Sequence, residues 1–195
     1  MAAKHRKTEC TALDWEQFLL LVDRLKKTTE YRFLLLICIG CYCGLRLSDI
    51  LQIRWKDVLE KDCFELSEKK TGKHRRITIN TSLKEVIDFT YASLQRRNQI
   101  QPGDFIFVNR QGGVLSKQFV NRKLHTIFHE YRVRVQNGSS HTLRKTFGKR
   151  VYEMNDRSEA ALILLSTIFN HNSVAVTRRY IGLSQQQIND VYINL

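Results

Sequence analysis

Six side chains in this sequence have the chemistry needed for a reaction at a phosphodiester. They are, in chain order, Arg46, Lys70, His141, Arg144, His171 and Tyr180. An arginine guanidinium binds phosphate oxygens through two parallel hydrogen bonds, and a tyrosine hydroxyl can attack phosphorus to form a covalent intermediate. Lysine and histidine side chains can transfer the protons. Attack on a phosphodiester builds up negative charge, so a catalyst without a metal needs several fixed cations around the phosphate.

The order of these residues gives the set its weight, because each of them alone has an ordinary explanation as a surface charge or a core tyrosine. His141 and Arg144 lie three residues apart at the start of a predicted helix. This spacing places both on one helical face, beside N–H groups that favour an anion. Tyr180 is one of seven tyrosines, and it is singled out by following His171 by nine residues, directly after a basic pair. A phenol with an ordinary pKa of roughly 10 needs such cations to favour the phenolate.

A strong positive charge indicates a polyanionic partner. Lysine and arginine total 32 against 19 acidic residues, which gives a formal net charge of +13 and a pI near 9.8. Such an excess indicates nucleic acid first, and a solvated positive face on a basic protein is the alternative. The side chains that we expect to hold the nucleic acid are Lys73, Lys117, Arg122, Lys123, Lys145, Arg178 and Arg179.

Composition also limits the class of protein. At 195 residues and 43% apolar content, the chain fits one domain with a real core. Its longest apolar run, 33–43, is shorter than the ~18 residues that span a bilayer, and the polar N-terminus lacks a signal-peptide pattern. An odd number of cysteines, five, fits a reducing compartment, so we expect a cytoplasmic protein. Three of them, Cys38, Cys41 and Cys43, are expected to be buried hydrophobes rather than metal ligands.

The elements that must position the reactive residues are mainly helical. Apolar spacing predicts helices over 15–25, 31–43, 83–94, 117–131, 142–154, 159–169 and 174–180, and another that starts near Ser48. Asp14 is the expected N-cap of the first helix, and Gly44 suits the end of the second. Two alternating runs, 63–67 and 76–80, predict a β-hairpin, with 105–108 as a candidate third strand. The expected fold class is mainly α with a small antiparallel β-sheet (α+β).

The chain is expected to divide into three segments. Residues 1–10 form a basic N-terminal arm, 11–183 form the catalytic domain, and 184–195 form a C-terminal amphipathic helix. The apolar residues of that last helix fall in a narrow stripe, Ile188, Val191, Tyr192 and Leu195. Such a stripe suits docking, either on its own domain or on a neighbouring subunit.

Together these residues resemble the catalytic domain of the tyrosine recombinases, also called the phage integrase family. The segment Gly44-Leu-Arg-Leu-Ser-Asp49 resembles the family's G-x-R-x-S-E motif, and Lys70, some two dozen residues after its arginine, matches the hairpin lysine. His141-x-x-Arg144 matches the H-x-x-R pair. His171 matches the histidine that follows, and Tyr180 matches the nucleophile. The resemblance spans about 11–181, and it leaves open whether Lys69, Lys70 or Lys73 is the catalytic lysine.

Three departures from the family pattern matter. Phe169-Asn170-His171 replaces L-G-H, so the tight turn falls to an asparagine, which tolerates the left-handed conformation. Lys145 stands where the family often has histidine, and we interpret it as an added phosphate contact. Family members commonly carry an N-terminal helical domain that clamps the other face of the DNA. That domain is missing here, so we expect either an excised catalytic fragment or a short, single-domain member.

The resemblance implies a site-specific DNA recombinase or integrase that needs no metal, ATP or other cofactor. Tyr180 would form a 3′-phosphotyrosyl intermediate while Arg46 and Arg144 hold the non-bridging oxygens. Protonation of the leaving 5′-oxygen, general acid–base transfer and support of the phosphate would fall to Lys70, His141 and His171, respectively. The resemblance also implies a homotetramer on paired DNA sites with C-terminal helix exchange. Two alternatives stay open: strand relaxation of the type IB topoisomerase kind, and a catalytically inactive DNA-binding regulator with the same fold.

Overall fold

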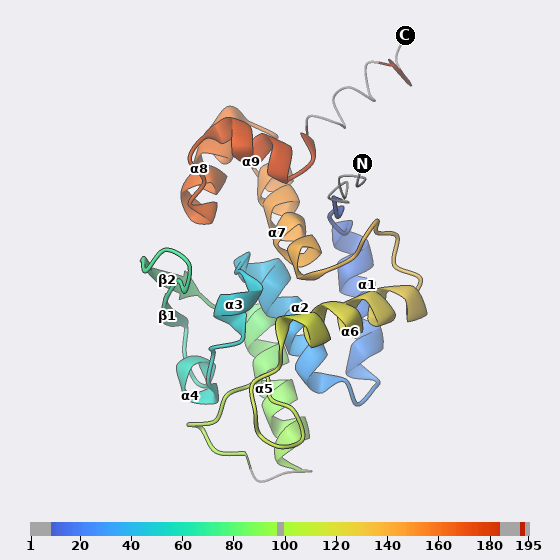
Figure 1. Ribbon diagram of the computed structural model, residues 1–195, viewed down its shortest axis with the longest axis vertical. Helices are drawn as coiled ribbons and strands as arrows, with labels where there is room; N and C mark the ends of the chain where they lie inside the picture. The colour runs from blue at the N-terminus through green and yellow to red at the C-terminus, as the bar shows by residue number, and fades with distance from the viewer. Residues whose placement is uncertain (1–8, 97–99, 184–191, 194–195) are drawn as a thin grey trace, which may run out of the picture.

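The computed structural model describes residues 9–96, 100–183 and 192–193. Its elements, in order, are α1 (Trp15–Lys26), α2 (Tyr31–Cys43), α3 (Leu47–Ile50), α4 (Trp55–Val58), β1 (Cys63–Ser67), β2 (His74–Thr78), α5 (Thr81–Gln95), α6 (Lys117–Glu130), α7 (Ser140–Met154), α8 (Glu159–Phe169) and α9 (Val174–Tyr180). Figure 1 shows α1 to α6 in a lower body, with α8 and α9 in a smaller layer at the far end of α7. This architecture confirms the expected fold class.

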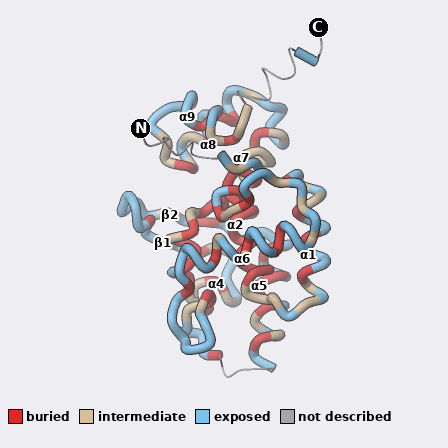
Figure 2. Tube along the Cα trace, turned by 45° about the vertical axis from the view of Figure 1, so that its right-hand side comes forward, coloured by how far each residue is buried: buried red, intermediate tan, exposed pale blue. Residues whose placement is uncertain are grey.

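Helix α2 lies at the centre of the fold because it is apolar on nearly every side. Every residue from Phe33 to Cys41 is buried, and a helix of this kind needs neighbours on all its faces. It packs against α1, α5 and α7, and Figure 2 shows the buried part of the chain concentrated around it. Gly40 permits the close approach of α7, since a Cβ there would lie 2.7 Å from the Cβ of Leu143. The three cysteines of α2 are free and buried, as predicted.

The end of α2 delivers the first arginine. Gly44 adopts a left-handed φ of 60°, which glycine tolerates without strain, and so ends the helix where the sequence predicted. Arg46 follows as the N-cap residue of α3. Because Leu47 and Ile50 of α3 are buried in the core, the backbone of Arg46 is held at the edge of that core.

The β-hairpin has the predicted antiparallel pairing, with a shifted second strand. Cys63 pairs with Thr78 at one end, and Ser67 pairs with His74 at the loop end. Strand β2 therefore begins two residues earlier than predicted and ends before Asn80. The reason is that the Asn80 side chain accepts a hydrogen bond from the Leu83 N–H and caps α5.

Two local predictions need correction. The third strand at 105–108 is wrong: Phe105 and Val108 form only isolated bridges, although Ile106 and Phe107 are as buried as strand residues. Asp14 does stand at the N-cap position of α1, but its side chain makes no capping bond. Its Oδ1 instead accepts a hydrogen bond from the Lys149 Nζ at 2.8 Å.

The upper layer has its own small core. Its buried residues are Tyr152, Ala161, Leu162, Leu165, Phe169 and Ile181. Helix α8 ends at Phe169, and Asn170 makes the turn with a left-handed φ of 52°, as predicted for the residue that replaces glycine. Helix α9 then begins after Ser173, whose hydroxyl accepts a hydrogen bond from the Val176 N–H. The turn between α8 and α9 brings its polar residues back toward the lower body.

No single helix in the described ranges is both long and apolar enough to cross a membrane; α8 and α9 meet that measure only together, as a pair bent by 90°. The predicted C-terminal helix over 184–195 lies outside the described residues, apart from 192–193. The predicted basic arm over 1–10 also lies outside them, apart from Glu9 and Cys10.

Candidate active site

All six predicted catalytic residues line one open cavity of about 720 Å³. They are Arg46, Lys70, His141, Arg144, His171 and Tyr180. They come from α3, the hairpin loop, α7 and the segment from the α8–α9 turn to the end of α9. The cavity therefore gathers residues that are up to 134 positions apart in the sequence, from Arg46 to Tyr180.

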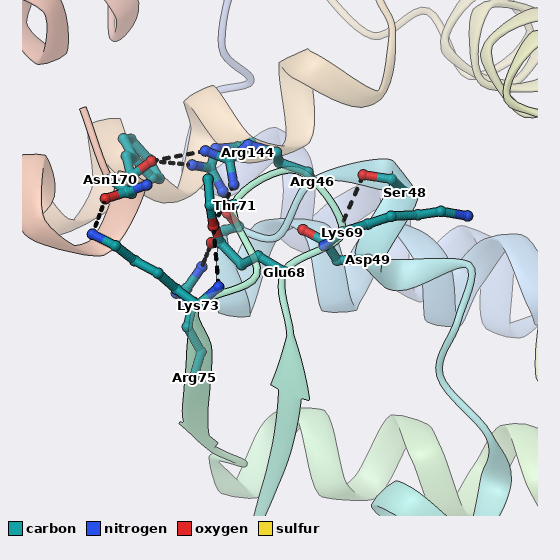
Figure 3. Close-up of polar contacts among 12 residues, drawn as sticks. Arg46, Ser48, Asp49, Glu68, Lys69, Thr71, Lys73, Arg75, Arg144 and Asn170 are labelled. Carbon is teal, nitrogen blue, oxygen red and sulfur yellow. Dashed lines mark hydrogen bonds and ion pairs between the residues drawn. The ribbon is translucent and has the colours of Figure 1, made fainter. Parts of the chain in front are cut away.

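The two arginines converge on one backbone oxygen. Arg46 Nη2 and Arg144 Nη2 donate to the carbonyl of Phe169 at 3.1 and 3.0 Å. Phe169 is the last residue of α8, so its carbonyl lacks a partner within the helix and lies at the partly negative end of the helix dipole. Arg144 Nη1 also donates to the carbonyl of Gly44. Figure 3 shows the two guanidinium groups side by side.

The second arginine is held inside the protein. Arg144 is only 3% exposed, and its guanidinium lies 4.3 Å from the centre of the Phe169 ring. Burial lowers the pKa of Arg144 to about 10, and the positive charges of Arg46 and Arg75 act in the same direction. Arg144 remains positively charged at neutral pH and is fixed before any ligand arrives.

The sequence did not single out Glu68, which binds the first arginine. Its carboxylate is 1% exposed, and its Oε2 accepts from Arg46 Nη1 at 2.6 Å. Its Oε1 accepts from Arg75 Nη1 at 3.1 Å. Figure 3 shows Glu68 between Arg46 and Arg75. In the sequence, Glu68 is one charged residue in a polar hairpin loop. Nothing in that pattern indicates that its side chain points inward.

Tyr180 holds its hydroxyl inside the cavity wall. Its ring packs edge-to-face on Phe169 and on His171, with ring centres 5.5 and 5.2 Å apart. The hydroxyl is buried and has no hydrogen-bond partner of good geometry in the described part of the chain. Burial raises the pKa of Tyr180 to about 12, although the nearby charges of Arg144 and Arg46 pull it down. The phenol is therefore protonated at neutral pH in the ligand-free protein.

The two histidines are suited to accept a proton. Loss of surrounding water lowers the pKa of His141, and the charges of Arg144 and Lys145 add to this effect. Burial likewise lowers the pKa of His171, with smaller contributions from Arg144 and Arg46. The Nδ1 of His171 lies 2.9 Å from the hydroxyl of Thr177, which fixes the orientation of the ring. Both side chains are therefore mostly neutral at pH 7.

The three candidate lysines of the hairpin loop are in different places. Lys69 and Lys70 line the cavity, whereas Lys73 lies outside it and donates from Nζ to the Asn170 Oδ1 at 2.6 Å. The backbone N–H of Lys69 is held by Asp49 Oδ1 at 3.0 Å. In Figure 3 the Lys69 side chain extends away from the two arginines.

The residues predicted to hold DNA are only partly near the cavity. Lys117 lines it. Lys145 is 7% exposed, and its Nζ lies over the Tyr180 ring, 5.5 Å from the ring centre. Lys123 instead pairs with Glu30 at 2.5 Å and lines a separate hollow. The remaining basic residues are exposed or half-buried at the surface, namely Lys73, Arg122, Arg178 and Arg179.

Comparison with known proteins decides the class of this site. The sequence profile of the phage integrase family matches residues 11–187. The chain belongs to the phage integrase family. It is 32% identical over 166 residues to the probable integrase/recombinase YoeC of Bacillus subtilis, a match that covers 80% of this chain and 81% of that relative. It is also 24% identical over 155 residues to the tyrosine recombinase XerH of Campylobacter jejuni, covering 79% of this chain and 42% of XerH.

Solved structures show that the fold is the one used by integrases and recombinases. The XerA recombinase matches with a TM-score of 0.71 and 17% identity, covering all of this chain and 66% of that one. XerH bound to its difH substrate in a post-cleavage complex matches with a TM-score of 0.69 and 24% identity, covering 93% of this chain and 52% of that one. The chain thus spans about half the length of XerH and most of the length of YoeC. These matches confirm the predicted family and fold.

Proposed function

We propose that this chain is the catalytic part of a site-specific recombinase that cuts and rejoins DNA through a 3′-phosphotyrosyl intermediate on Tyr180. One observation carries the proposal: Tyr180 lines the same cavity as two arginines whose guanidinium groups meet at one carbonyl. Phage integrase family membership supports this function. So do family structures that contain DNA, such as XerH with difH and a lambda integrase dimer with a core site.

The arginines bind the phosphate in the proposed reaction. A guanidinium has five N–H donors. In Arg46 and in Arg144, one N–H of each Nη atom donates to a protein oxygen. The other N–H groups are left for a ligand. Arg46 and Arg144 hold the two non-bridging oxygens as negative charge grows on them. Because both side chains are already fixed, little reorganisation is needed when the charge develops.

Tyr180 supplies the nucleophile and loses a proton in the same step. Its oxygen bonds to phosphorus, the bond from phosphorus to the 5′-oxygen breaks, and the 3′-phosphate stays on the protein. His141 is the proton acceptor that we assign, because burial, together with the charges of Arg144 and Lys145, lowers its pKa and favours the neutral ring. His171, oriented by Thr177, supports the phosphate. A 5′-hydroxyl from a partner strand then reverses the step and releases the tyrosine.

Lys70 is the proton donor that we assign to the leaving 5′-oxygen. The hydrogen bond from Lys73 to Asn170 occupies that lysine outside the cavity, and the Lys69 side chain points away from the arginines. Lys70 lines the cavity and remains available. An ammonium group can deliver its proton directly to the alkoxide as it leaves.

The wider assembly belongs to the same proposal. Residues 11–183 act as the catalytic domain, residues 1–10 act as a basic arm, and residues 184–195 form a helix that docks on a neighbouring subunit. The active unit is a homotetramer on paired sites in double-stranded DNA, with exchange of that helix between subunits. Its reaction takes place in the cytoplasm, where that DNA is accessible.

The test is the covalent adduct itself. The substrate is a pool of short duplexes, each with one nick and randomised flanking sequence, so that the released strand end diffuses away and the adduct accumulates. The reaction is run in EDTA and stopped with SDS, and the bound DNA is sequenced. Wild type is expected to form the adduct, and Tyr180→Phe is expected to form none. Tyr91→Phe, whose hydroxyl accepts from Gln95 on α5, is the matched control and should react as wild type does.

Other outcomes identify the alternatives. DNA cleavage that leaves no adduct and occurs only when Mg²⁺ replaces the EDTA would indicate a metal-dependent nuclease and overturn the proposal. Relaxation of a supercoiled plasmid without strand exchange would indicate a topoisomerase of type IB. Salt-sensitive DNA binding that is identical in wild type and Tyr180→Phe, with no adduct in either, would indicate a binding regulator.

A further inference from the structure

Glu68 is a buried carboxylate whose two oxygens both accept hydrogen bonds from neighbouring side chains. It follows β1 directly and is 1% exposed, whereas the next loop residues, 69–73, are all exposed. Oε2 accepts from Arg46 Nη1 at 2.6 Å and from the Thr71 hydroxyl at 2.8 Å. Oε1 accepts from Arg75 Nη1 at 3.1 Å. A buried charge is tolerated only when it is paired and hydrogen-bonded in this way.

The carboxylate stays ionised at neutral pH. Burial alone would raise the pKa of Glu68, but the Thr71 hydroxyl and the two arginines together outweigh it and hold that pKa below its usual value. The contact with Arg46 is therefore a charge-assisted hydrogen bond, which is shorter and stronger than a neutral one.

Glu68 restricts Arg46 in a way that no other contact in the described chain does. The Arg46 side chain is long, and it is 21% exposed at the cavity wall. The Phe169 carbonyl holds Nη2 and the Glu68 carboxylate holds Nη1, so the two contacts together define the plane of the guanidinium. With Nη1 released, the group could rotate about its remaining contact.

Glu68 also organises the loop that carries Lys70, through both its main-chain carbonyl and its carboxylate. The backbone N–H groups of Thr71 and Gly72 both donate to the Glu68 carbonyl, at 3.2 and 2.8 Å. The Thr71 side chain donates to the Glu68 carboxylate. Lys70 lies between these two anchored positions, at 68 and 71. One residue therefore connects the arginine of α3 to the turn of the hairpin.

We propose that Glu68 is a positioning residue of the reaction, which sets the guanidinium plane of Arg46 and the hairpin turn of Lys70 so that both cations meet one phosphate. This inference rests on the function proposed above. It predicts that DNA affinity and the rate of strand cleavage respond differently to loss of the Glu68 charge. Removing a negative charge near DNA should leave binding unchanged or strengthen it, whereas misplacing Arg46 and Lys70 should slow strand cleavage.

The experiment measures binding and cleavage separately in the whole chain. Glu68→Gln keeps the shape but loses the charge, Glu68→Asp keeps the charge but shortens the side chain, and Glu65→Gln is the matched control. Glu65 lies on the same hairpin, is exposed and pairs opposite Arg76 in the sheet, away from the cavity. Kd is measured by titration with a nicked duplex recovered from the adduct pool. The first-order rate of adduct formation is then measured at saturating DNA.

The expected result is a rate that falls roughly 10- to 100-fold in Glu68→Gln, with Kd unchanged or lower. The rate of adduct formation in Glu68→Asp should lie between those of Glu68→Gln and wild type. Glu65→Gln should share any change in Kd but react at the wild-type rate. Thermal unfolding is recorded for each protein, so that the fraction folded at the assay temperature is known.

Two results would overturn the inference. One is a Glu68→Gln rate equal to that of wild type at saturating DNA. The other is a fall in the rate of adduct formation that either matches the unfolded fraction of Glu68→Gln or is accompanied by weaker DNA binding. In that case Glu68 would be a structural residue. Failure of the proposed function looks different: wild type itself would form no adduct, and the role of Glu68 would fall with it.

Discussion

Replacing Tyr180 with phenylalanine should abolish strand cleavage and make the protein more stable. The hydroxyl of Tyr180 is buried, and in the described part of the chain it has no hydrogen-bond partner of good geometry. The unfolded chain exposes the same hydroxyl to water, which satisfies it. Folding therefore loses hydrogen bonds at this atom without replacing them, and the phenylalanine variant avoids that loss.

The size of the gain follows from two opposing effects. A buried hydroxyl without a partner costs about 1–3 kcal/mol in protein substitution data. The charges of Arg144 and Arg46 act favourably on the phenol oxygen, as their effect on its pKa indicates, and this offsets part of the cost. We therefore expect Tyr180→Phe to raise the free energy of unfolding by about 1 kcal/mol. For a chain of this size, that corresponds to a rise in Tm of about 2–4 °C.

The assay is thermal and urea unfolding of Tyr180→Phe beside Tyr91→Phe. The Tyr91 hydroxyl accepts from Gln95 Nε2 at 2.8 Å, so the same chemical change there removes a real hydrogen bond. The free energy of unfolding of Tyr91→Phe should therefore be lower than that of wild type by about 0.5–1 kcal/mol. Opposite signs for the two variants would support the argument. A Tyr180→Phe variant that is less stable than wild type would refute it, because the hydroxyl would then make a stabilising bond to Arg144.

Two further predictions concern the turn after α8 and the hairpin carboxylate. Asn170 has a left-handed φ of 52°. Asn170→Ala should therefore lower the free energy of unfolding by about 1 kcal/mol, whereas Asn170→Gly should change it little. Thermal unfolding of both variants measures the difference. If Asn170→Gly proves as harmful as Asn170→Ala, the hydrogen bond to Lys73 matters more than the backbone angle. The pKa of Glu68 is lower in the folded protein than in the unfolded chain. The ionised carboxylate therefore contributes its full stabilisation at pH values above its unfolded-state pKa of about 4.3. This stabilisation is lost as the pH falls through the folded-state pKa. Urea unfolding between neutral and acid pH should therefore show a shallower acid loss in Glu68→Gln than in wild type, and equal slopes would contradict this.

The sequence predicted the parts of the fold that depend on local pattern. The apolar run of α2 and its glycine end, the hairpin, and the helices α7 to α9 follow from periodicity and capping residues, and the structure has them. The segment 105–108 failed for a physical reason. Its apolar run reports burial of Ile106 and Phe107, but a strand also needs a continuous backbone partner, and the described chain offers only isolated bridges there.

The site was predictable where residue type and chain order carry the signal. All six residues of the proposed catalytic set line one cavity. What the sequence could not give is the set of contacts that hold them. The pairing of Glu68 with Arg46 joins residues 22 positions apart, and the carbonyl of Phe169 has no side-chain signature at all. The sequence also could not show that Lys145, interpreted as a phosphate contact, has its Nζ 5.5 Å from the centre of the Tyr180 ring.

The carbonyl of Phe169 explains how two like charges remain close together. Arg46 and Arg144 repel each other, but both donate to this one oxygen, which lies at the negative end of α8, and Glu68 adds a full negative charge beside them. The same backbone continues through Asn170 into His171, and α9 then leads to Tyr180. A movement of this turn would therefore shift the anchor of both arginines together with the nucleophile. In the proposed reaction, phosphate binding by the arginines would in this way be coupled to the position of Tyr180 through a single peptide group.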